Sequence, residues 1–189
     1  MEILEEQVLS KELTIYEGRP EDVSGRRPEE IKTYDVLDQL GIPYERVDHQ
    51  PVMTMEDCQR ADDALGFPAC KNLFLRNTQK TRFYLLMMPG DKKFKTKDLS
   101  HQLGIARLSF GEEEFMAEYL GVYPGSATVM GLIQDTGHKV NLVMDKEVAE
   151  GEYIVCHPCA NTSSIKLKTK DVLEKFLPWT GHEPAFVEL

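Results

Sequence analysis

Two apolar segments, residues 73–76 and 82–88, constrain the fold of this chain more than any other part of it. They are joined by residues 77–80, a spacing that is typical of a β-hairpin. The run Leu73-Phe74-Leu75 is typical of a buried strand. The sequence therefore predicts an antiparallel strand pair that other elements must cover.

Helices and strands alternate along the rest of the chain. Pro28, two glutamates after it and Gly41 predict a helix over residues 28–40. Further helices are predicted from residue 54 or 55 to 65, and over 96–103, 112–120 and 171–177. Further strands are predicted over residues 44–47, 107–110, 129–133, 139–144, 153–156, 164–167 and, at an edge, 186–187.

This order of elements predicts a single α+β (mixed α/β) domain. Its sheet is expected to be mixed but largely antiparallel and to be packed with helices. The segments 129–133 and 139–144 are expected to form a hairpin around a turn at residues 135–137. Residues 1–27 are expected to form a peripheral extension with a helix and a loop, and residues 28–189 the domain itself.

Composition places the chain among ordinary globular proteins. It has 189 residues, of which 41% are hydrophobic and 29% are charged. No apolar run approaches the roughly 20 residues that cross a bilayer. The first six residues, MEILEE, are acidic and do not resemble a secretion signal. We therefore expect a cytoplasmic protein with no membrane partner.

Charge is unevenly distributed along the chain. The net charge is −10, yet residues 71–107 contain nine of the 22 cations and only two of the 32 acids. A protein that coats nucleic acid without sequence preference would be basic throughout, because it binds by neutralising many phosphates. The pattern favours a local anion site instead, and no DNA partner is expected. Alternatively, the basic residues of segment 92–97 simply belong to a solvent-exposed loop and the start of a helix.

The flanks of the first strand carry groups that suit an anionic ligand. Lys71 and Asn72 precede the apolar run, and Arg76 follows it. An ammonium beside an amide, which both donates and accepts hydrogen bonds, is suited to a phosphate or a carboxylate. The same residues are also compatible with a strand that simply ends in solvated charges.

Four cysteines leave open a thiol function. Cys156 and Cys159 form a C-x-x-C motif, which occurs in redox dithiols and in zinc sites. Cys58 and Cys70 do not form a second such pair, so no metal site is expected. A loop, rather than a helix, follows Pro158, which disfavours a redox motif. Free thiols are the expected state.

Six short motifs, in order, resemble the YbaK/prolyl-tRNA-synthetase-associated editing domain family, and in particular its freestanding ProX-type deacylases. They are KNLFLR at residues 71–76, MPGDK at 88–92, RLSF at 107–110, GVYPGS at 121–126, HP at 157–158 with NT at 161–162, and TGHEP at 180–184. The resemblance covers roughly residues 28–189. It implies a partly barrel-like sheet, no cofactor, and hydrolysis of a mischarged aminoacyl-tRNA, usually alanyl-tRNA for proline.

The resemblance also implies roles for individual residues. Lys71 would contact the phosphate end of the acceptor strand, and Asn72 is its neighbour in the motif. The glycine-rich loop falls on Gly125, Ser126, Ala127 and Thr128, and the pocket histidine falls on His157. Lys71, Gly125 and His157 are therefore the candidate catalytic residues. Backbone N–H groups of Gly125 and Ser126 would stabilise the oxyanion, although Pro124-Gly125 is also an ordinary turn dipeptide.

Further residues are expected around the substrate. His49, Met53 and Thr54 would form a second wall of the amino-acid pocket, and Asn161 would hold the loop after His157. Met53 is equally compatible with a core position. Arg76, Lys92 and Lys93 are the candidate tRNA contacts. The expected partners are the acceptor end of an aminoacyl-tRNA and, as the resemblance suggests, a prolyl-tRNA synthetase.

One position departs from the family's pattern. The loop is usually GxxxP, but Val129 occupies its fifth position. The change frees the φ angle that proline fixes and restores an N–H group. It leaves three functions open: a deacylase for alanine, a deacylase for cysteine or serine, and an inactive relative that only binds tRNA or a synthetase.

Overall fold

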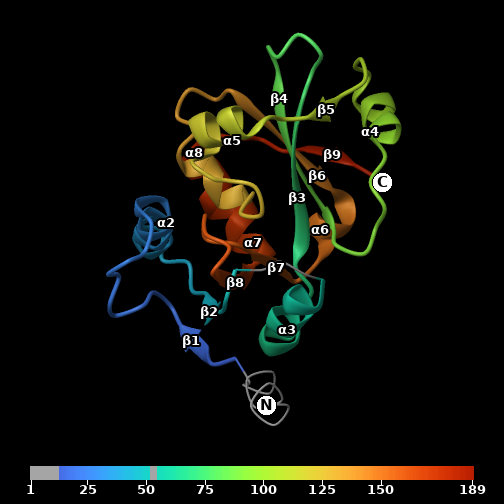
Figure 1. The fold of residues 1–189 in the computed structure, drawn as a ribbon. Coiled ribbons are helices and arrows are strands. Elements are labelled where there is room, and N and C mark those ends of the chain that lie inside the picture. The colour runs from blue at the N-terminus through green and yellow to red at the C-terminus, as the bar shows by residue number, and fades with distance from the viewer. Residues whose placement is uncertain (1–12, 52–54) are drawn as a thin grey trace, which may run out of the picture.

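The strands form two open sheets in the computed structural model, which describes residues 13–51 and 55–189 (Figure 1). The first sheet is antiparallel, in the order β1-β2-β8-β7. The second sheet is mixed, in the order β5-β3-β4-β6-β9. The strands are β1 Ile15–Glu17, β2 Glu45–Asp48, β3 Cys70–Arg76, β4 Phe83–Pro89, β5 Ser109–Phe110, β6 Val140–Asp145, β7 Tyr153–Cys156, β8 Ser163–Lys168 and β9 Ala185–Val187.

Helices pack around both sheets. They are α2 Pro28–Gln39, α3 Met55–Leu65, α4 Thr96–Leu103, α5 Glu113–Leu120, a 3-10 helix Val129–Ile133, α6 Lys146–Glu150, α7 Thr169–Asp171, a π-helical turn Val172–Phe176 and α8 Leu177–Thr180. Figure 1 shows α5 and α8 on one side of the second sheet and α4 on the other. Among the described residues, no helix is both long enough and apolar enough to traverse a bilayer.

The predicted hairpin lies at the centre of the second sheet. β3 starts three residues earlier than the sequence indicated, and β4 is shifted by one residue. All seven residues of β3 pair with β4, from Cys70 opposite Pro89 to Arg76 opposite Phe83. Successive residues of β4 face opposite sides of the sheet. Phe83, Leu85 and Met87 belong to the larger hydrophobic core, and Tyr84, Leu86 and Met88 to a second core that includes Leu99 of α4. Helices therefore cover both faces, which explains the long apolar run.

The segment 129–133 was wrongly predicted as a strand. It forms a buried 3-10 helix, and the Thr128 hydroxyl caps it by accepting a hydrogen bond from the Met130 N–H at 3.2 Å. A short apolar run is compatible with either a strand or a buried helix, so the periodicity of this segment did not distinguish between the two. Consequently β6 has no hairpin partner there and pairs in parallel with β4 instead.

Other elements differ from the predictions at their ends. β1 and α6 were not predicted, and the predicted strand over 107–110 contracts to Ser109–Phe110. The last predicted helix is the middle of a longer helical run that starts at Thr169 and ends at Thr180. The α+β class with a mixed sheet is confirmed, but the described strands form two sheets, and neither closes into a barrel. The domain boundary at residue 27 stays a prediction.

A buried hydrogen-bond network ties the start of β6 to the C-terminal region. Asp135 accepts hydrogen bonds from the N–H groups of Lys139 at 2.8 Å and Val140 at 2.9 Å, and from His182 Nε2 at 2.8 Å. Burial opposes ionisation of this carboxyl group, but these donors outweigh it and lower the pKa of Asp135 below its ordinary value. The carboxylate therefore stabilises the folded state.

The Asp135 network predicts an acid-dependent contribution to stability. The contribution is complete above the unfolded pKa of about 3.9, and it is lost as the pH falls through the lower folded value. Asp135→Asn turns an NH₂ group toward N–H donors, so we expect the free energy of unfolding at pH 7 to fall by about 2–4 kcal/mol. Urea denaturation at pH 7 and between pH 5 and 2 measures both effects. Glu118→Gln, on the exposed face of α5, is the control, and an equal effect of the two substitutions would contradict this role.

Candidate active site

The start of β3, the loop after α5 and the end of β7 enclose a small cavity. Its volume is about 260 Å³, and it lies where the two sheets approach each other. Among the described residues, it is lined by Ala69, Cys70, Lys71, Asn72, Leu73, Gly125, Ala127, Cys156, His157 and Ser164. The three candidate catalytic residues, Lys71, Gly125 and His157, thus lie around one space.

Lys71 is held at the rim of this cavity by the turn that follows β4. The residue is half-buried on β3, opposite Met88, and its ammonium group donates a hydrogen bond to the carbonyl oxygen of Lys92. The bond uses one of the three ammonium donors. Lys71 therefore presents a positioned positive charge to the cavity and to the surface beside it.

Asn72 connects β3 to the 3-10 helix. Its Oδ1 accepts a hydrogen bond from the N–H of Val129 at 3.1 Å, and its Nδ2 lies 3.4 Å from the carbonyl oxygen of Cys70. A proline at position 129 would have no N–H group to donate. The departure from GxxxP is therefore accommodated by a hydrogen bond that tethers the loop to the central strand.

The glycine-rich loop begins with a tight turn in which Gly125 has φ +91°. Only glycine adopts this conformation without strain. Ser126 is buried and closes the turn: its N–H and its hydroxyl both donate to the carbonyl oxygen of Tyr123, at 2.9 Å each. The N–H groups of Gly125 and Ala127 have no acceptor among the described residues. These two N–H groups belong to residues that line the cavity, whereas Ser126 has a structural position outside the cavity lining.

Two further contacts fix the loop against the strand ends. Thr128 donates from its hydroxyl to the carbonyl oxygen of His157 at 2.6 Å. Asn161 accepts at Oδ1 from the Tyr123 hydroxyl at 2.8 Å and donates its backbone N–H to that hydroxyl at 3.1 Å. Thr128 and Asn161 therefore position the walls of the cavity and do not line it.

His157 has a defined tautomer and a low tendency to become protonated. Its Nδ1 lies 2.7 Å from the carbonyl oxygen of Ser163, so this nitrogen carries a proton and donates it. Burial lowers the pKa of His157 below its ordinary value, and the nearby His49 ring adds to the effect. Near neutral pH the ring is uncharged, and Nε2 is left as an acceptor.

His49 supports the second wall, but it does not line the cavity. Its Nδ1 lies 2.8 Å from the carbonyl oxygen of Gln50, and its Nε2 lies 2.9 Å from the hydroxyl of Ser164, which does line the cavity. Sequence reasoning missed Ser164, although its place directly after the His157 loop was a signal for it. Met53 and Thr54 lie outside the described residues.

The thiols of Cys70, Cys156 and Cys159 are poor nucleophiles. Burial raises the pKa of Cys70 to about 11, that of Cys159 to about 12, and that of Cys156 further above its ordinary value. Thiols with such pKa values are protonated near neutral pH. All four cysteines are free, and no group of three or more metal-binding side chains occurs within residues 13–51 and 55–189.

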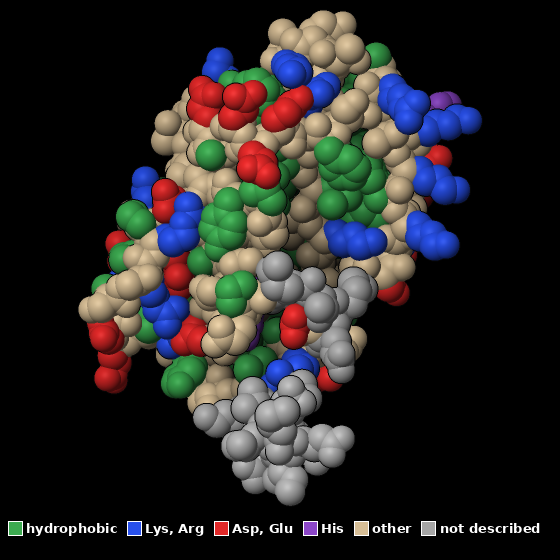
Figure 2. All heavy atoms as spheres, in the orientation of Figure 1, with side chains coloured by type: hydrophobic (Ala, Val, Ile, Leu, Met, Phe, Trp, Pro, Cys, Tyr) green, Lys and Arg blue, Asp and Glu red, His purple; other side chains and the backbone are tan. Residues whose placement is uncertain are grey.

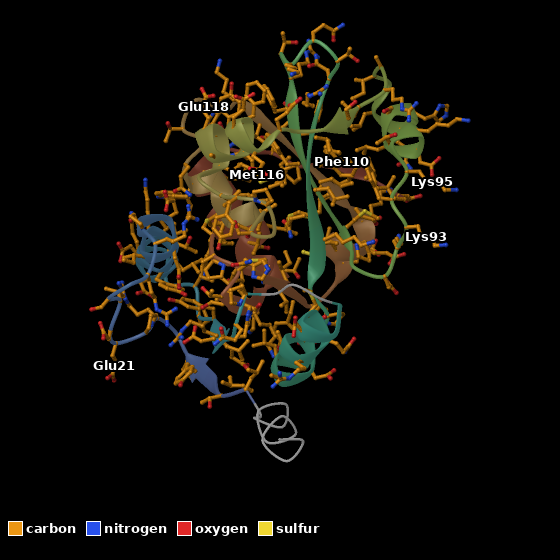
Figure 3. The ribbon with its side chains drawn as sticks, in the orientation of Figure 1. Glu21, Lys93, Lys95, Phe110, Met116 and Glu118 are labelled. Carbon is orange, nitrogen blue, oxygen red and sulfur yellow. The ribbon has the colours of Figure 1, made fainter. Side chains whose placement is uncertain are left out.

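The candidate tRNA contacts lie in three different environments. Arg76 is at the opposite end of β3 from the cavity and forms an ion pair with Glu112 at 2.6 Å. Lys92 is paired with Asp145 at 3.1 Å and with Glu147 at 2.8 Å. Lys93 is exposed and extends away from the molecule (Figure 3). The structure does not bring Arg76 to the cavity, and acids already compensate the charges of Arg76 and Lys92.

Comparison with known proteins gives a consistent family assignment. The model of the aminoacyl-tRNA editing domain matches residues 49–175. The prolyl-tRNA editing protein ProX of Acetoanaerobium sticklandii is 31% identical over 153 residues, which are 81% of this chain and 93% of that protein. A mouse prolyl-tRNA synthetase associated domain-containing protein 1 is 35% identical over 155 residues, covering 80% of this chain and 90% of the relative.

A solved structure shares the fold. It is described as that of a candidate trans-editing enzyme for prolyl tRNA synthetase, and it matches 86% of this chain and 98% of its own with a TM-score of 0.63 at 14% identity. The family model spans more than half of the chain, and the sequence relatives cover about four fifths of it. The chain therefore belongs to the aminoacyl-tRNA editing domain family.

Proposed function

We propose that the protein hydrolyses the ester bond of mischarged aminoacyl-tRNA, with alanyl-tRNA(Pro) as the first candidate substrate. The observation that carries the proposal is the convergence of Lys71, Gly125 and His157 on one cavity of about 260 Å³. This volume is below the range of about 300–1,000 Å³ for ordinary ligand pockets. It suits a small aminoacyl group, while the RNA stays outside.

The charge and the donors at the cavity match the ends of such a substrate. Lys71 is a point charge at the rim and is suited to the phosphate of the terminal nucleotide. The free N–H groups of Gly125 and Ala127 are the candidates that stabilise the oxyanion formed at the ester carbonyl. Ser126 has no part in this step because its N–H is used within the turn.

Water is the proposed nucleophile. Its oxygen attacks the ester carbonyl carbon, the bond from that carbon to the ribose oxygen breaks, and the ribose oxygen leaves with a proton. The products are the free amino acid and the tRNA. As the family resemblance suggests, the neighbouring ribose hydroxyl helps to orient this water. The neutral His157 ring offers Nε2 as an acceptor without repelling the ammonium group of the amino acid.

Discrimination follows from the size of the cavity. One methylene group in a pocket is worth about 1–3 kcal/mol, so a synthetase for proline will mischarge smaller amino acids, and a second hydrolytic site removes them. A chain of this kind acts in trans, beside a prolyl-tRNA synthetase. Alanine, cysteine and serine are the candidate amino acids, because the Val129 loop departs from the usual pattern.

Removal of the Lys71 charge tests the proposal most directly. We expect wild-type protein to accelerate ester loss from alanyl-tRNA(Pro), and we expect Lys71→Ala to lower kcat/KM about 10- to 100-fold, as one lost charge-assisted contact would. Lys71→Arg, which keeps the charge, should lower kcat/KM less than Lys71→Ala does. Lys170→Ala on the surface should leave kcat/KM unchanged. A panel of alanyl-, cysteinyl-, seryl- and prolyl-tRNA(Pro) measures the specificity. No acceleration on any of them would identify a relative that only binds.

Protonation of His157 is expected to set the pH below which activity is lost. Because burial lowers the pKa of His157 below its ordinary value near 6.5, activity should fall only when the pH drops through that lowered pKa. His157→Gln keeps a hydrogen-bonding side chain but does not titrate, so this acid limb should disappear. Rates of ester loss from pH 4.5 to 7.5 give the profile. An unchanged profile and unchanged rates would remove His157 from the site.

The proposed water mechanism predicts that the thiols are dispensable. Iodoacetamide should modify the exposed Cys58 and leave the buried Cys156 and Cys159 unmodified, as mass spectrometry of the native protein would show. The Cys156→Ser, Cys159→Ser double variant should deacylate within about twofold of wild type once its folded fraction is measured by circular dichroism. Loss of activity in a fully folded double variant would favour a thiol enzyme instead.

A further inference from the structure

A second, wider groove adjoins the candidate active site. Its volume is about 530 Å³, and it lies between β3, β5 and the segment that leads into α4. Phe94 and Phe110 supply its aromatic surface, and Lys95, Lys97 and Arg107 supply its charge. Figure 2 shows this region as a hydrophobic patch bordered by basic side chains, and Figure 3 labels Phe110 and Lys95 within it.

Phe110 is unusually exposed for a large apolar residue. Its side chain is 60% exposed, the largest fraction among the exposed large hydrophobic residues that the structure describes. Phe94 packs against it edge-on, with ring centroids 6.0 Å apart. The position of Phe110 is fixed by β5, where it pairs with Leu75 of β3. A supported ring with a free face is suited to stacking against another flat ring.

The cations of the groove are free, in contrast to those on either side of it. Lys95, Lys97 and Arg107 are exposed, and none of them forms an ion pair within the described part of the chain. Arg76 and Lys92, by comparison, are both paired with acids. In a protein with a net charge of −10, three uncompensated cations around an exposed ring favour an anionic ligand that also carries flat rings.

The groove is continuous with the cavity. Lys71 and Leu73, two residues apart on β3, line both spaces. A chain whose last residue occupies the cavity can therefore pass Lys71 and enter the groove. Single-stranded nucleic acid combines unpaired bases that stack on aromatic side chains with phosphates that basic residues neutralise. A duplex keeps its bases stacked internally and offers no free base to Phe110.

We propose that this groove binds the unpaired 3′ end of an RNA acceptor strand, with a base stacked on Phe110 and the phosphates on Lys95, Lys97 and Arg107. The inference rests on the proposed function for the direction of the chain, because the aminoacyl end must lie in the cavity. It assigns RNA contacts to residues other than Arg76 and Lys92, whose charges are internally compensated.

Kinetics with two substrates separate the contribution of the groove to substrate binding from that of the cavity. One substrate is alanyl-tRNA(Pro), and the other is alanyl-adenosine, which has no upstream nucleotides to occupy the groove. Phe110→Ala should raise the KM for the tRNA about 5- to 100-fold, the loss of one stacked base, with kcat unchanged. The ratio of the two KM values should therefore rise. Phe186→Ala, a second exposed phenylalanine on β9, is the matched control. An equal effect of Phe110→Ala on both substrates would overturn the proposal.

Direct binding tests the groove without any hydrolysis. The probe is a fluorescein-labelled single-stranded RNA ending in CCA, followed by anisotropy between 50 and 300 mM salt. Phe110→Ala should weaken binding. A Lys95→Ala, Lys97→Ala double variant should also weaken it, and should reduce the slope of log Kd against log salt concentration by about 1–2. Lys168→Ala with Lys170→Ala is the matched control for charge. Equal binding of a blunt RNA duplex or of polyglutamate through the same residues would overturn the proposal.

The two experiments separate the inference from the function on which it rests. Binding through Phe110 without ester hydrolysis would support the groove and refute the proposed function. Ester hydrolysis with Phe110→Ala indistinguishable from wild type in both assays would support the function and refute the groove.

Discussion

The antiparallel pairing of β3 with β4 is the contact on which the candidate site depends. It extends over all seven residues of β3, so the positions of Lys71 and Arg76 along the strand are fixed relative to each other. Hydrophobic side chains bury both faces of β4, which holds this pair at the centre of the second sheet. Lys71 therefore reaches the cavity between the sheets, whereas Arg76 reaches Glu112 at the far end.

Side-chain hydrogen bonds to the backbone then build the cavity around Lys71. Asn72 accepts from Val129, Thr128 donates to the His157 carbonyl oxygen, and Asn161 accepts from Tyr123. Each bond joins segments that are distant in the sequence. The residues that the family resemblance singled out thus divide into two groups: some line the cavity, and others, such as Ser126, Thr128 and Asn161, hold its walls.

Charge compensation decides which cations remain available to a ligand. Residues 71–107 are strongly basic, yet acids from distant parts of the chain pair with several of these cations, for instance Asp145 with Lys92. Lys95, Lys97 and Arg107 keep their charges exposed. An exposed cation interacts with a mobile anion at little desolvation cost, whereas a paired one must first be separated from its partner.

Local signals in the sequence determined much of the fold. The helix Thr96–Leu103 was predicted to the residue, because Gly104 ends it with a positive φ angle, and Gly121 ends Glu113–Leu120 in the same way. The β3–β4 hairpin and the family motifs could also be recognised in the sequence, and the motifs indicated Lys71, Gly125 and His157 as candidate catalytic residues. Turn, cap and motif residues act over a few positions, so they can be read without knowledge of distant contacts.

Only the tertiary structure decided the rest. It turned the apolar segment 129–133 into a 3-10 helix, placed β6 in parallel beside β4, and separated the paired cations from the free ones. It also brought Phe94 and Phe110 together, 16 residues apart in the sequence, as one aromatic surface. The physical reason is that burial, strand pairing and charge compensation depend on contacts between distant segments, which the order of the residues alone does not fix.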